Sequence, residues 1–573
     1  MVDQRVHKLS VEVPMYSPDL APIADSLALS SLVAALPLVT IFVTLGALRW
    51  KAHLAALTSV GVAVVVAVLA YGMPADLAVL SASEGAIFGL FPIMWIVLGA
   101  LFLHQLTVVS GKFEDLRATF HLISDDPRIQ AIIIAFCFGG LLEALAGFGA
   151  PAAISGVMLV AVGFPALRAA MVVLLANTAP VAFGAMAIPI ITAGTLTGIP
   201  YEEIGAVVGR QTPFLALFVP LILVFVADGR RGVREIWPLA LVVGAVFGAA
   251  QFVSSNFISV ELTDIIASLA GMGAAVAMLR VWQPQGSTEA AERLMSTHDA
   301  EDLPDDAPSG GGNVAVEARR ELDQVAQRAS LLTRARITMA LFPYLLVIVV
   351  FCIAKLVAPV TEFLASTDRL VEWPGLHGAV ESASTIYKWQ WLSSPGTLLV
   401  ICAIIIGLVQ GVAAKRIATE FLTTAKTLRF AFLTVASVLA LAYVMNLSGQ
   451  TQTMGHWIAG TGAAFAFLSP ILGWLGTAVT GSDTSANALF ATLQQTAAEK
   501  AGLDPNLLVA ANTSGGVVGK MISPQNLTIA AAAVGLAGRE SDIFRKLIGW
   551  SLGLLFALCL LVGLQSTVLS WMV

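Results

Sequence analysis

Residues 176–190 read ANTAPVAFGAMAIPI, and residues 511–525 read ANTSGGVVGKMISPQ. Each stretch opens on Ala-Asn-Thr, and a glycine, a methionine and a proline follow at the same offsets in both. Glycine and proline interrupt helices, and here they fall inside strongly apolar segments. Paired interruptions of this kind are typical of the discontinuous helices that form the binding site of a secondary transporter. The repeat therefore predicts a transport protein built from two related halves.

A glycine-rich segment with one acidic residue precedes each stretch. The first, GGLLEALAGFGAPAAI over 139–154, holds Glu143, and the second, GWLGTAVTGSDTSANALF over 473–490, holds Asp483. A carboxylate in the membrane core costs about 2.5–3.5 kcal/mol, so it is normally protonated, paired or turned towards a polar cavity. We predict that both acids couple protons to transport; the alternatives are a fixed helix partner for Glu143 and a cap of helix 485–499 for Asp483. The backbone is expected to break at the glycines of these segments, Gly147, Gly149 and Gly481.

The second stretch also carries a cation, Lys520, with no other charge in the surrounding apolar segment. An ammonium group in the membrane is a natural counter-ion for an organic carboxylate. The first stretch has Ala185 at the equivalent position, so a single cation would serve a single anionic substrate. The alternative is an ion pair of Lys520 with Glu143 or Asp483.

The uncharged polar groups of the two stretches are candidates for the rest of the substrate site. Amides and hydroxyls next to opened backbone can hold a carboxylate and a hydroxyl group. Besides Lys520, the predicted substrate-binding residues are Asn177, Thr178, Asn512, Thr513 and Ser514. Further backbone breaks are predicted at Gly515 and Gly516. Hydrogen bonding between packed helices is the alternative for any one of these side chains.

Composition sets the fold class. The chain has 573 residues, of which 57% are hydrophobic and 12% charged, and a mean hydropathy of +0.86. A soluble protein of this length needs more charge on its surface, so we predict an all-α polytopic membrane protein. Apolar runs long enough to cross a membrane lie near 27–48, 53–72, 86–107, 129–147, 169–190, 213–227, 236–254, 262–282, 338–358, 396–413, 430–447, 457–479, 507–535 and 546–571. The shorter runs 150–163 and 482–499 abut the glycine-rich breaks and favour re-entrant segments.

Polar stretches divide the chain into four parts. We expect a polar N-terminal segment over 1–26, a first membrane half over 27–282 and a second over 337–573. Between the halves, residues 283–336 combine mixed charge with Pro and Gly, which predicts a flexible cytoplasmic linker. The N-terminal segment lacks the basic-then-apolar pattern of a cleaved signal peptide.

Positive charge gathers in alternate loops and predicts the orientation. The loops that carry it, which we place on the cytoplasmic side, lie near 49–51, 112–128, 230–234, 415–429 and 539–546. The loops between them carry mainly acids, Glu261 and Asp264 among them, and are placed outside. On this map the span before Glu143 starts inside, whereas the span before Asp483 starts outside. The two halves then form an inverted repeat whose breaks face each other near the bilayer centre.

Other chemistry has no support in the sequence. The four cysteines lie scattered in apolar runs without paired spacing, and no metal-ligand spacing or nucleophile motif is present. Residues 515–521 (GGVVGKM) have the wrong spacing for a phosphate-binding loop, and no Ser or Thr follows the lysine. We therefore expect no enzyme activity, no cofactor, no metal and no nucleic-acid partner.

At these segments the sequence resembles the L-lactate permease family, which also carries glycolate. The similar stretches are GGLLEALAGFGAPAAI, LLANTAPVAFGAMAIP, GWLGTAVTGSDTSANALF and ANTSGGVVGKMISPQN. The resemblance covers both halves, over about 27–572, and implies a proton-coupled permease for small 2-hydroxymonocarboxylates in the cytoplasmic membrane. The chain departs from the family pattern Glu-Gly-Ala-Ala-Gly-Phe-Gly-Thr-Pro, since Ala144 and Ala150 replace a glycine and a threonine.

The hypothesis from the sequence is a multi-pass transporter in the cytoplasmic (inner) membrane that moves one small monocarboxylate, L-lactate or glycolate, together with a proton. A sodium-coupled carrier of di- or monocarboxylates is the alternative, because Asn-Thr motifs at broken helices also coordinate Na⁺ through carbonyl groups. One intramembrane lysine and two acids favour a monocarboxylate with a proton. Oligomers are possible, and the sequence does not decide their size.

Overall fold

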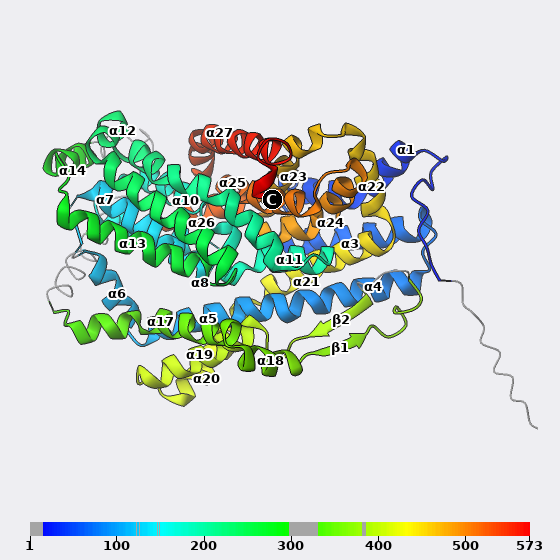
Figure 1. Cartoon of the computed structure of the whole chain (residues 1–573), viewed down its shortest axis with the longest axis horizontal. Helices are drawn as coiled ribbons and strands as arrows, with labels where there is room; N and C mark the ends of the chain where they lie inside the picture. The colour runs from blue at the N-terminus through cyan, green and yellow to red at the C-terminus, as the bar shows by residue number, and fades with distance from the viewer. Residues whose placement is uncertain are drawn as a thin grey trace, which may run out of the picture.

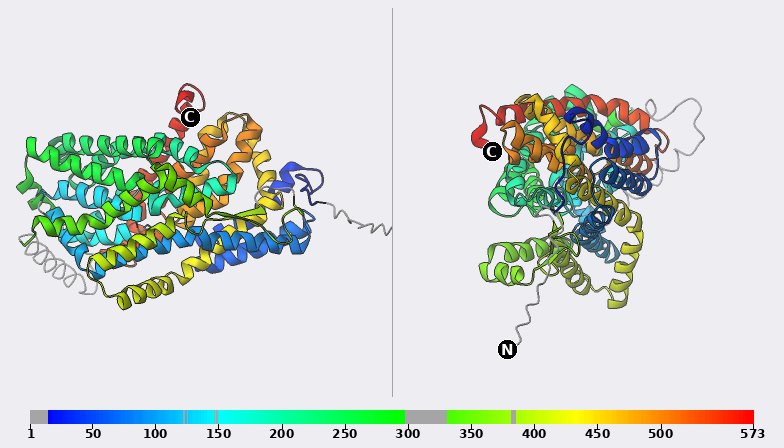
Figure 2. Two further views of the ribbon diagram at one scale, coloured as in Figure 1. Left: turned by 60° about the horizontal axis from the view of Figure 1, so that its bottom comes forward. Right: turned by 90° about the vertical axis from the view of Figure 1, so that its right-hand side faces the viewer.

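The predicted polytopic helical fold is confirmed. The structure is a computed structural model, and it describes residues 15–121, 123–124, 126–145, 147, 149–296, 331–380 and 385–573. By length and composition, nine helices of the described residues suit a membrane span, or ten if the bent pair Ala166–Ala176 and Val181–Thr197 is counted as one more. Most helices run along one axis of the molecule, as the left view of Figure 2 shows. These segments are apolar and almost uncharged. In lipid such a segment forms a helix, because a helix satisfies all of its backbone hydrogen bonds internally.

The N-terminal part of the chain, up to the first basic loop, is made of short and long helices. A long pair, α4 and α5, forms one rod along the molecule in Figure 1. The elements up to the first basic loop are α1 (Leu27–Ala34), α2 (Leu36–Phe42), η1 (Val43–Ala47), α3 (Ala52–Leu69), α4 (Ala75–Phe88), η2 (Gly89–Met94), α5 (Trp95–Val109) and α6 (Lys112–His121).

The rest of the first half contains the first broken segments. Its elements are α7 (Pro127–Ala131), η3 (Ile132–Phe138), α8 (Gly139–Leu145), α9 (Ala150–Ala161), α10 (Ala166–Ala176), η4 (Val181–Phe183), α11 (Gly184–Thr197), α12 (Tyr201–Phe257), α13 (Thr263–Val281) and α14 (Ser287–Ser296). The long α12 contains the two predicted spans 213–227 and 236–254, and it folds back on itself at Asp228 and Gly229. Part of the predicted linker 283–336 forms α14. Residues 297–330 of the linker lie outside the described residues.

The second half adds a short hairpin and the second set of broken segments. Its elements are α17 (Arg334–Leu356), α18 (Ala358–Ser366), β1 (Arg369–Glu372), β2 (Ile386–Trp389), α19 (Pro395–Val409), α20 (Ala414–Thr427), α21 (Arg429–Leu447), α22 (Gln450–Ile458), η6 (Ala459–Thr461), α23 (Ala464–Thr480), α24 (Asp483–Ala501), α25 (Pro505–Lys520), α26 (Pro524–Ala533), α27 (Glu540–Gln565) and η7 (Ser570–Met572). The strands β1 and β2 pair antiparallel. The predicted span 507–535 is two helices, α25 and α26, because Ser523 caps a new helix that starts at Pro524.

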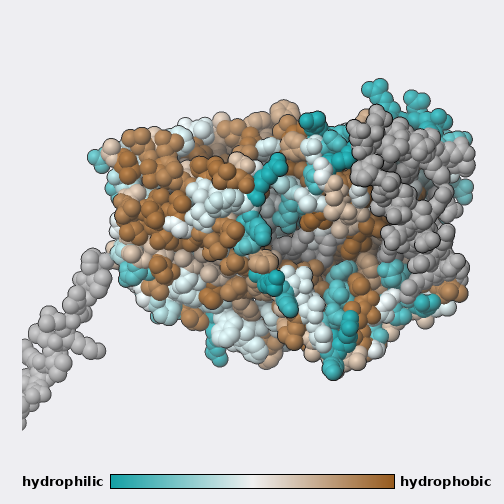
Figure 3. Space-filling view, turned by 180° about the vertical axis from the view of Figure 1, so that it is seen from behind, coloured by the Kyte–Doolittle hydropathy of each residue, from teal (hydrophilic) through white to brown (hydrophobic). Residues whose placement is uncertain are grey.

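Burial separates the inner helices from those that face lipid. The segment Pro127–Leu145 is fully buried within the protein, whereas only 33% of Ala52–Leu69 is buried at a higher hydropathy. Apolar residues that stay exposed on such a segment have lipid as their natural surroundings. Figure 3 shows broad apolar areas on one face of the molecule, interrupted by narrower polar ones.

The broken helices of the two halves pack against each other. Helix α11 packs against α24, and α9 packs against α26. The breaks before α9 and α24 turn on glycines with positive φ, Gly147, Gly149 and Gly481. An inverted repeat would produce reciprocal contacts of this type; the repeat itself stays a prediction.

Contacts between loops also join the two halves of the chain. The backbone N–H of Tyr16 donates to the Ala379 carbonyl over 2.8 Å, and the Asn506 amide donates to Glu203 over 3.2 Å. Each contact joins a segment before residue 283 to a segment after residue 336. Residues 1–14 of the predicted N-terminal segment lie outside the described residues.

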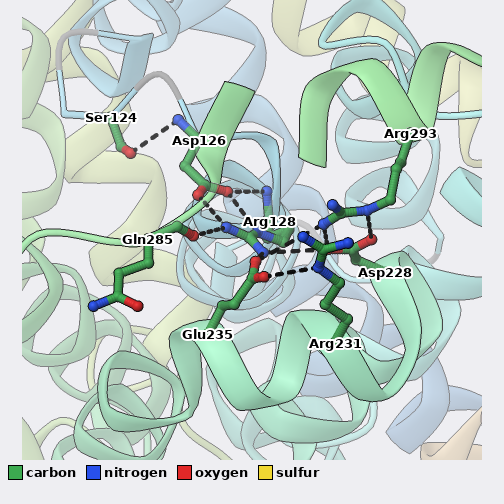
Figure 4. A network of polar contacts seen from close by, with 8 residues as sticks. All are labelled: Ser124, Asp126, Arg128, Asp228, Arg231, Glu235, Gln285 and Arg293. Atoms are coloured by element: carbon green, nitrogen blue, oxygen red, sulfur yellow. Dashed lines mark hydrogen bonds and ion pairs between the residues drawn. The ribbon is translucent and has the colours of Figure 1, made fainter. Parts of the chain in front are cut away.

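A buried arginine, Arg128, connects three segments of the first half through polar contacts (Figure 4). Arg128 is fully buried and donates to Asp126, to Asp228 at the fold of α12 and to Glu235. It also donates to the Gln285 carbonyl over 2.8 Å, just before α14. The predicted basic loop residue is therefore an internal ion-pair centre, since three carboxylates surround it.

Replacing this arginine should destabilise the fold. Arg128→Met removes the cation from the buried Asp126, which typically costs about 3–5 kcal/mol. We expect a clear drop in the apparent melting temperature of the detergent-solubilised protein, measured by intrinsic fluorescence. The matched control is Arg231→Met, because Arg231 also pairs with Glu235 but its side chain is 63% exposed. Equal melting temperatures for the two variants would show that the buried network contributes no more than a surface pair.

Candidate functional site

The centre of the molecule holds an ion pair between the two halves. The Nζ of Lys520, at the end of α25, lies 2.5 Å from Oε1 of Glu143 on α8. Only 9% of the lysine side chain and 3% of the glutamate side chain are exposed. Two buried charges in this setting are stable only as a pair, because each alone has lost its hydration. One of the alternatives open from the sequence, a Lys520–Glu143 pair, is thus present in the structure.

A glycine of the first broken stretch makes room for this pair. A Cβ atom on Gly184 would lie 2.8 Å from Oε1 of Glu143, which is closer than real side chains approach. Any larger residue at position 184 would push the carboxylate away from the lysine. On the other side of Glu143, Gly147 turns the chain with a φ of +52°, a conformation that favours glycine.

Asp483 lies near the pair but does not join it. Its Oδ1 lies 3.4 Å from the Thr477 hydroxyl, and it interacts electrostatically with both Lys520 and Glu143. The N-cap of α24 is Ser482, whose hydroxyl accepts from the Ser485 N–H, so the alternative of Asp483 as the cap is wrong. The carboxylate is held against the backbone of α25.

A small pocket opens beside the lysine. It is a narrow cleft with no room for a further molecule in this conformation, and it is lined by Leu174, Asn177, Thr178, Val517, Lys520, Met521 and Asn526. Thr178 donates to the Leu175 carbonyl over 2.7 Å, which leaves its oxygen available as an acceptor. Within the described part of the chain, the buried Oδ1 of Asn177 has no hydrogen-bond partner. The pocket thus combines one cation with polar groups from both halves.

The other three predicted substrate-binding residues lie away from this pocket. Asn512 donates to Asn487 over 2.8 Å, and Thr513 exchanges hydrogen bonds with the same side chain. Ser514 donates to Gln211 of α12 over 2.6 Å. These side chains join α25 to α24 and α12, so the structure places them in helix packing.

The two Ala-Asn-Thr motifs differ in where the backbone breaks. In the first half α10 ends at Ala176, directly before Asn177. In the second half the motif lies inside α25, and the helix ends only at Lys520. Gly515 and Gly516 are therefore not breaks. A Cβ on Gly515 would lie 2.0 Å from the Pro470 carbonyl and one on Gly516 would lie 1.9 Å from Asp483, so both allow close helix approach.

The sequence analysis missed Asn526, which lines the pocket from the first turn of α26. Its side-chain amide donates to the Ser523 hydroxyl over 2.9 Å and to the Lys520 carbonyl over 3.2 Å. The pattern Ser523-Pro524 is a sequence signal for a helix start, and it would have placed Asn526 beside the second break.

The fold and the site together define a membrane transport protein: apolar helices, broken segments and a buried charge pair next to a pocket lined from both halves. No group of three or more His, Cys, Asp or Glu side chains that could hold a metal ion is found among the described residues.

The chain belongs to the L-lactate permease family, whose model matches residues 30–569. It is 43% identical to the L-lactate permease of Bacillus subtilis over 96% of this chain and 98% of that one. It is 42% identical to the glycolate permease GlcA of Escherichia coli, over 95% and 97% of the two chains. Among solved structures, the YdaH transporter of Alcanivorax borkumensis covers 85% of this chain and 87% of its own, with 14% identity and a TM-score of 0.44, too distant to carry an argument. The resemblance seen in the sequence is confirmed, and the protein is a permease rather than an enzyme.

Two asparagines at equivalent positions should respond differently to alanine. Asn512→Ala removes two buried hydrogen bonds, one to Asn487 and one from Gln494, which costs about 1–3 kcal/mol, so the melting temperature should fall. The KM for transport should stay normal in the protein that folds. The control is Asn177→Ala, which should raise the KM and leave the melting temperature unchanged. A raised KM in Asn512→Ala at normal stability would return Asn512 to the substrate site.

Proposed function

We propose that the protein is a secondary active transporter that moves small 2-hydroxymonocarboxylates, L-lactate and glycolate, together with a proton across the cytoplasmic membrane. The observation that carries the proposal is the buried Lys520–Glu143 pair at the edge of the pocket. The names of the relatives, L-lactate permease and glycolate permease, support the substrate class.

The substrate carboxylate competes with Glu143 for Lys520. An ammonium group forms charge-assisted hydrogen bonds to a carboxylate, and Lys520 lines the pocket as well as pairing with Glu143. The N-terminus of α26 starts at the same place, and the dipole of this helix adds to the attraction for an anion. Once the substrate holds Lys520, the Glu143 carboxylate lies buried without a counter-ion and takes up a proton.

The hydroxyl group of the substrate finds acceptors in the pocket. The buried Oδ1 of Asn177 lacks a partner among the described residues, and a 2-hydroxyl group is a donor of suitable size. A site built to bind a hydroxyl rejects the analogue that lacks it, because the polar group is then left unpaired. Propionate should therefore be a poorer substrate than lactate.

Uptake into proteoliposomes tests the proposal. Labelled L-lactate, glycolate, propionate and succinate are offered under an imposed pH gradient and, separately, under an imposed Na⁺ gradient. Accumulation of lactate or glycolate driven by the pH gradient alone supports the proposal. Accumulation driven only by Na⁺ would favour the sodium-coupled alternative, and preference for succinate would contradict the monocarboxylate site.

Substrate affinity should depend strongly on the buried lysine. Loss of a charge-assisted hydrogen bond costs about 1.5–3 kcal/mol, or roughly ten- to a hundredfold in affinity. We expect Lys520→Met to raise the KM for lactate by this factor. The control is Lys426→Met, because Lys426 lies exposed on α20. An unchanged KM in Lys520→Met would make the lysine a purely structural partner of Glu143.

The proton should be carried by Glu143. Glu143→Gln keeps the size of the side chain but cannot titrate, so accumulation against a gradient should be lost. Exchange of labelled for unlabelled lactate should continue, because it needs no net proton movement. Both activities are measured in the same proteoliposomes. Full pH-driven accumulation by the variant would assign the proton to another group, with Asp483 the first candidate.

A further inference from the structure

A third carboxylate lies buried next to Glu143. The sequence pattern placed Asp264 in an external acidic loop, but it lies in the first turn of α13 and is fully buried. Its Oδ1 accepts a hydrogen bond from the Gln251 amide over 3.0 Å. The same amide donates to the Ala179 carbonyl over 3.1 Å, at the first broken stretch. Asp264 is therefore attached to the transport site rather than to the surface.

The packing of α13 brings Asp264 level with Glu143. A Cβ on Gly140 would lie 2.7 Å from the Ser268 hydroxyl, and one on Gly271 would lie 3.4 Å from Sγ of Cys137. Position 137 thus faces 271 and position 140 faces 268, so the two segments run antiparallel. One further turn along α8 reaches Glu143, and one turn back along α13 reaches Asp264. The two carboxylates also interact electrostatically.

One oxygen of each carboxylate is without a partner in the described part of the chain. Across the described residues, Oε2 of Glu143, Oδ2 of Asp264 and the Ser268 hydroxyl are buried and make no hydrogen bond. Buried polar atoms normally have partners, so three such atoms between two packed helices indicate that a proton or a water is shared there. The other oxygen of each acid is already taken, by Lys520 and Gln251 respectively.

The remaining charged and titratable groups around α13 are engaged elsewhere or are distant. Outside Asp264, Glu261 accepts from Tyr201 over 2.8 Å and lies 2.9 Å from Nζ of Lys355. Cys137 of η3 faces Gly271, almost two turns along α13. Helix α12 presents the neutral Gln251 to Asp264. Its acids Asp228 and Glu235 belong to the Arg128 network, and Glu202 and Glu203 contact Lys355 and Asn506. Glu143 is thus the acid that faces Asp264.

We infer that Asp264 is the proton-transfer partner of Glu143, linking it to the N-terminal end of α13. The inference rests on the proposed proton symport. In the transfer step the proton on Oδ2 of Asp264 moves to Oε2 of Glu143, directly or through one water. Asp264 is left as a carboxylate and Glu143 becomes neutral, so Lys520 is released to the substrate carboxylate. When the substrate leaves on the cytoplasmic side, Glu143 releases its proton there and the Lys520–Glu143 pair re-forms, while Asp264 takes up the next proton from the external side.

The inference is tested with Asp264→Asn in proteoliposomes. Asparagine keeps the hydrogen bond to Gln251 but carries no transferable proton. We expect the initial rate of pH-driven lactate accumulation to fall at least tenfold, while lactate exchange and the KM change by less than twofold. The matched control is Glu261→Gln, which removes an acid one turn away on the external side and should retain accumulation.

Three outcomes separate this inference from the proposed function. If the wild-type protein shows no pH-driven accumulation, the proposed function fails. If the wild type accumulates lactate and Asp264→Asn does so at the same rate, the inference alone is overturned. Equal losses of accumulation and exchange would also overturn it, because a structural role affects both.

A second variant keeps the test decisive if Asp264→Asn does not fold. Asp264→Glu retains a transferable proton at a changed distance. We expect it to accumulate lactate with a pH profile displaced from that of the wild type, whereas exchange keeps its wild-type profile. An accumulation profile identical to that of the wild type would contradict proton transfer through this side chain.

Discussion

The structure depends on one buried ion pair that bridges the two halves of the chain. Lys520 and Glu143 lie 2.5 Å apart with almost no exposure, and neither charge is stable there alone. The pair constrains the residue at position 184, because a Cβ atom on Gly184 would meet the Glu143 carboxylate. The pair also fixes how α8 meets the end of α25, so it sets the relation between the first and second halves of the chain.

The broken backbone near the pair is strained at three consecutive residues that follow Gly184. Ala185, Met186 and Ala187 all have positive φ, between 45° and 60°, which costs about 1–2 kcal/mol for each residue with a side chain. Irregular backbone at membrane depth is tolerated only when protein covers it or it lines a cavity. Here it is fully enclosed, and it directly adjoins the pocket residues. The first half therefore contributes opened backbone, whereas the second half contributes the cation.

The sequence predicted the chemistry of the centre better than its geometry. Glu143 and Lys520 stand out as lone charges in apolar runs, and their cost in lipid is enough to identify them. The doubled Ala-Asn-Thr spacing says nothing of which helix face each copy presents, so Asn177 lines the pocket while Asn512 packs against α24. The position of Asp264 could not be predicted for another reason. Next to Glu261 in the sequence it resembles a loop acid, and its place beside Glu143 follows only from the antiparallel packing of α13 on α8.

Charge balance at the Lys520–Glu143 pair explains why substrate and proton would move together if the substrate carboxylate displaces Glu143 from Lys520. In the empty site Lys520 and Glu143 neutralise each other. A carboxylate substrate alone would displace Glu143 and leave an uncompensated buried anion, and a proton alone on Glu143 would leave the lysine without a partner; each state carries the penalty of an unpaired buried charge. With substrate and proton bound together, Lys520 has a counter-ion and Glu143 is neutral. Coupling is then a property of the buried pair itself, because each solute removes the penalty that the other creates.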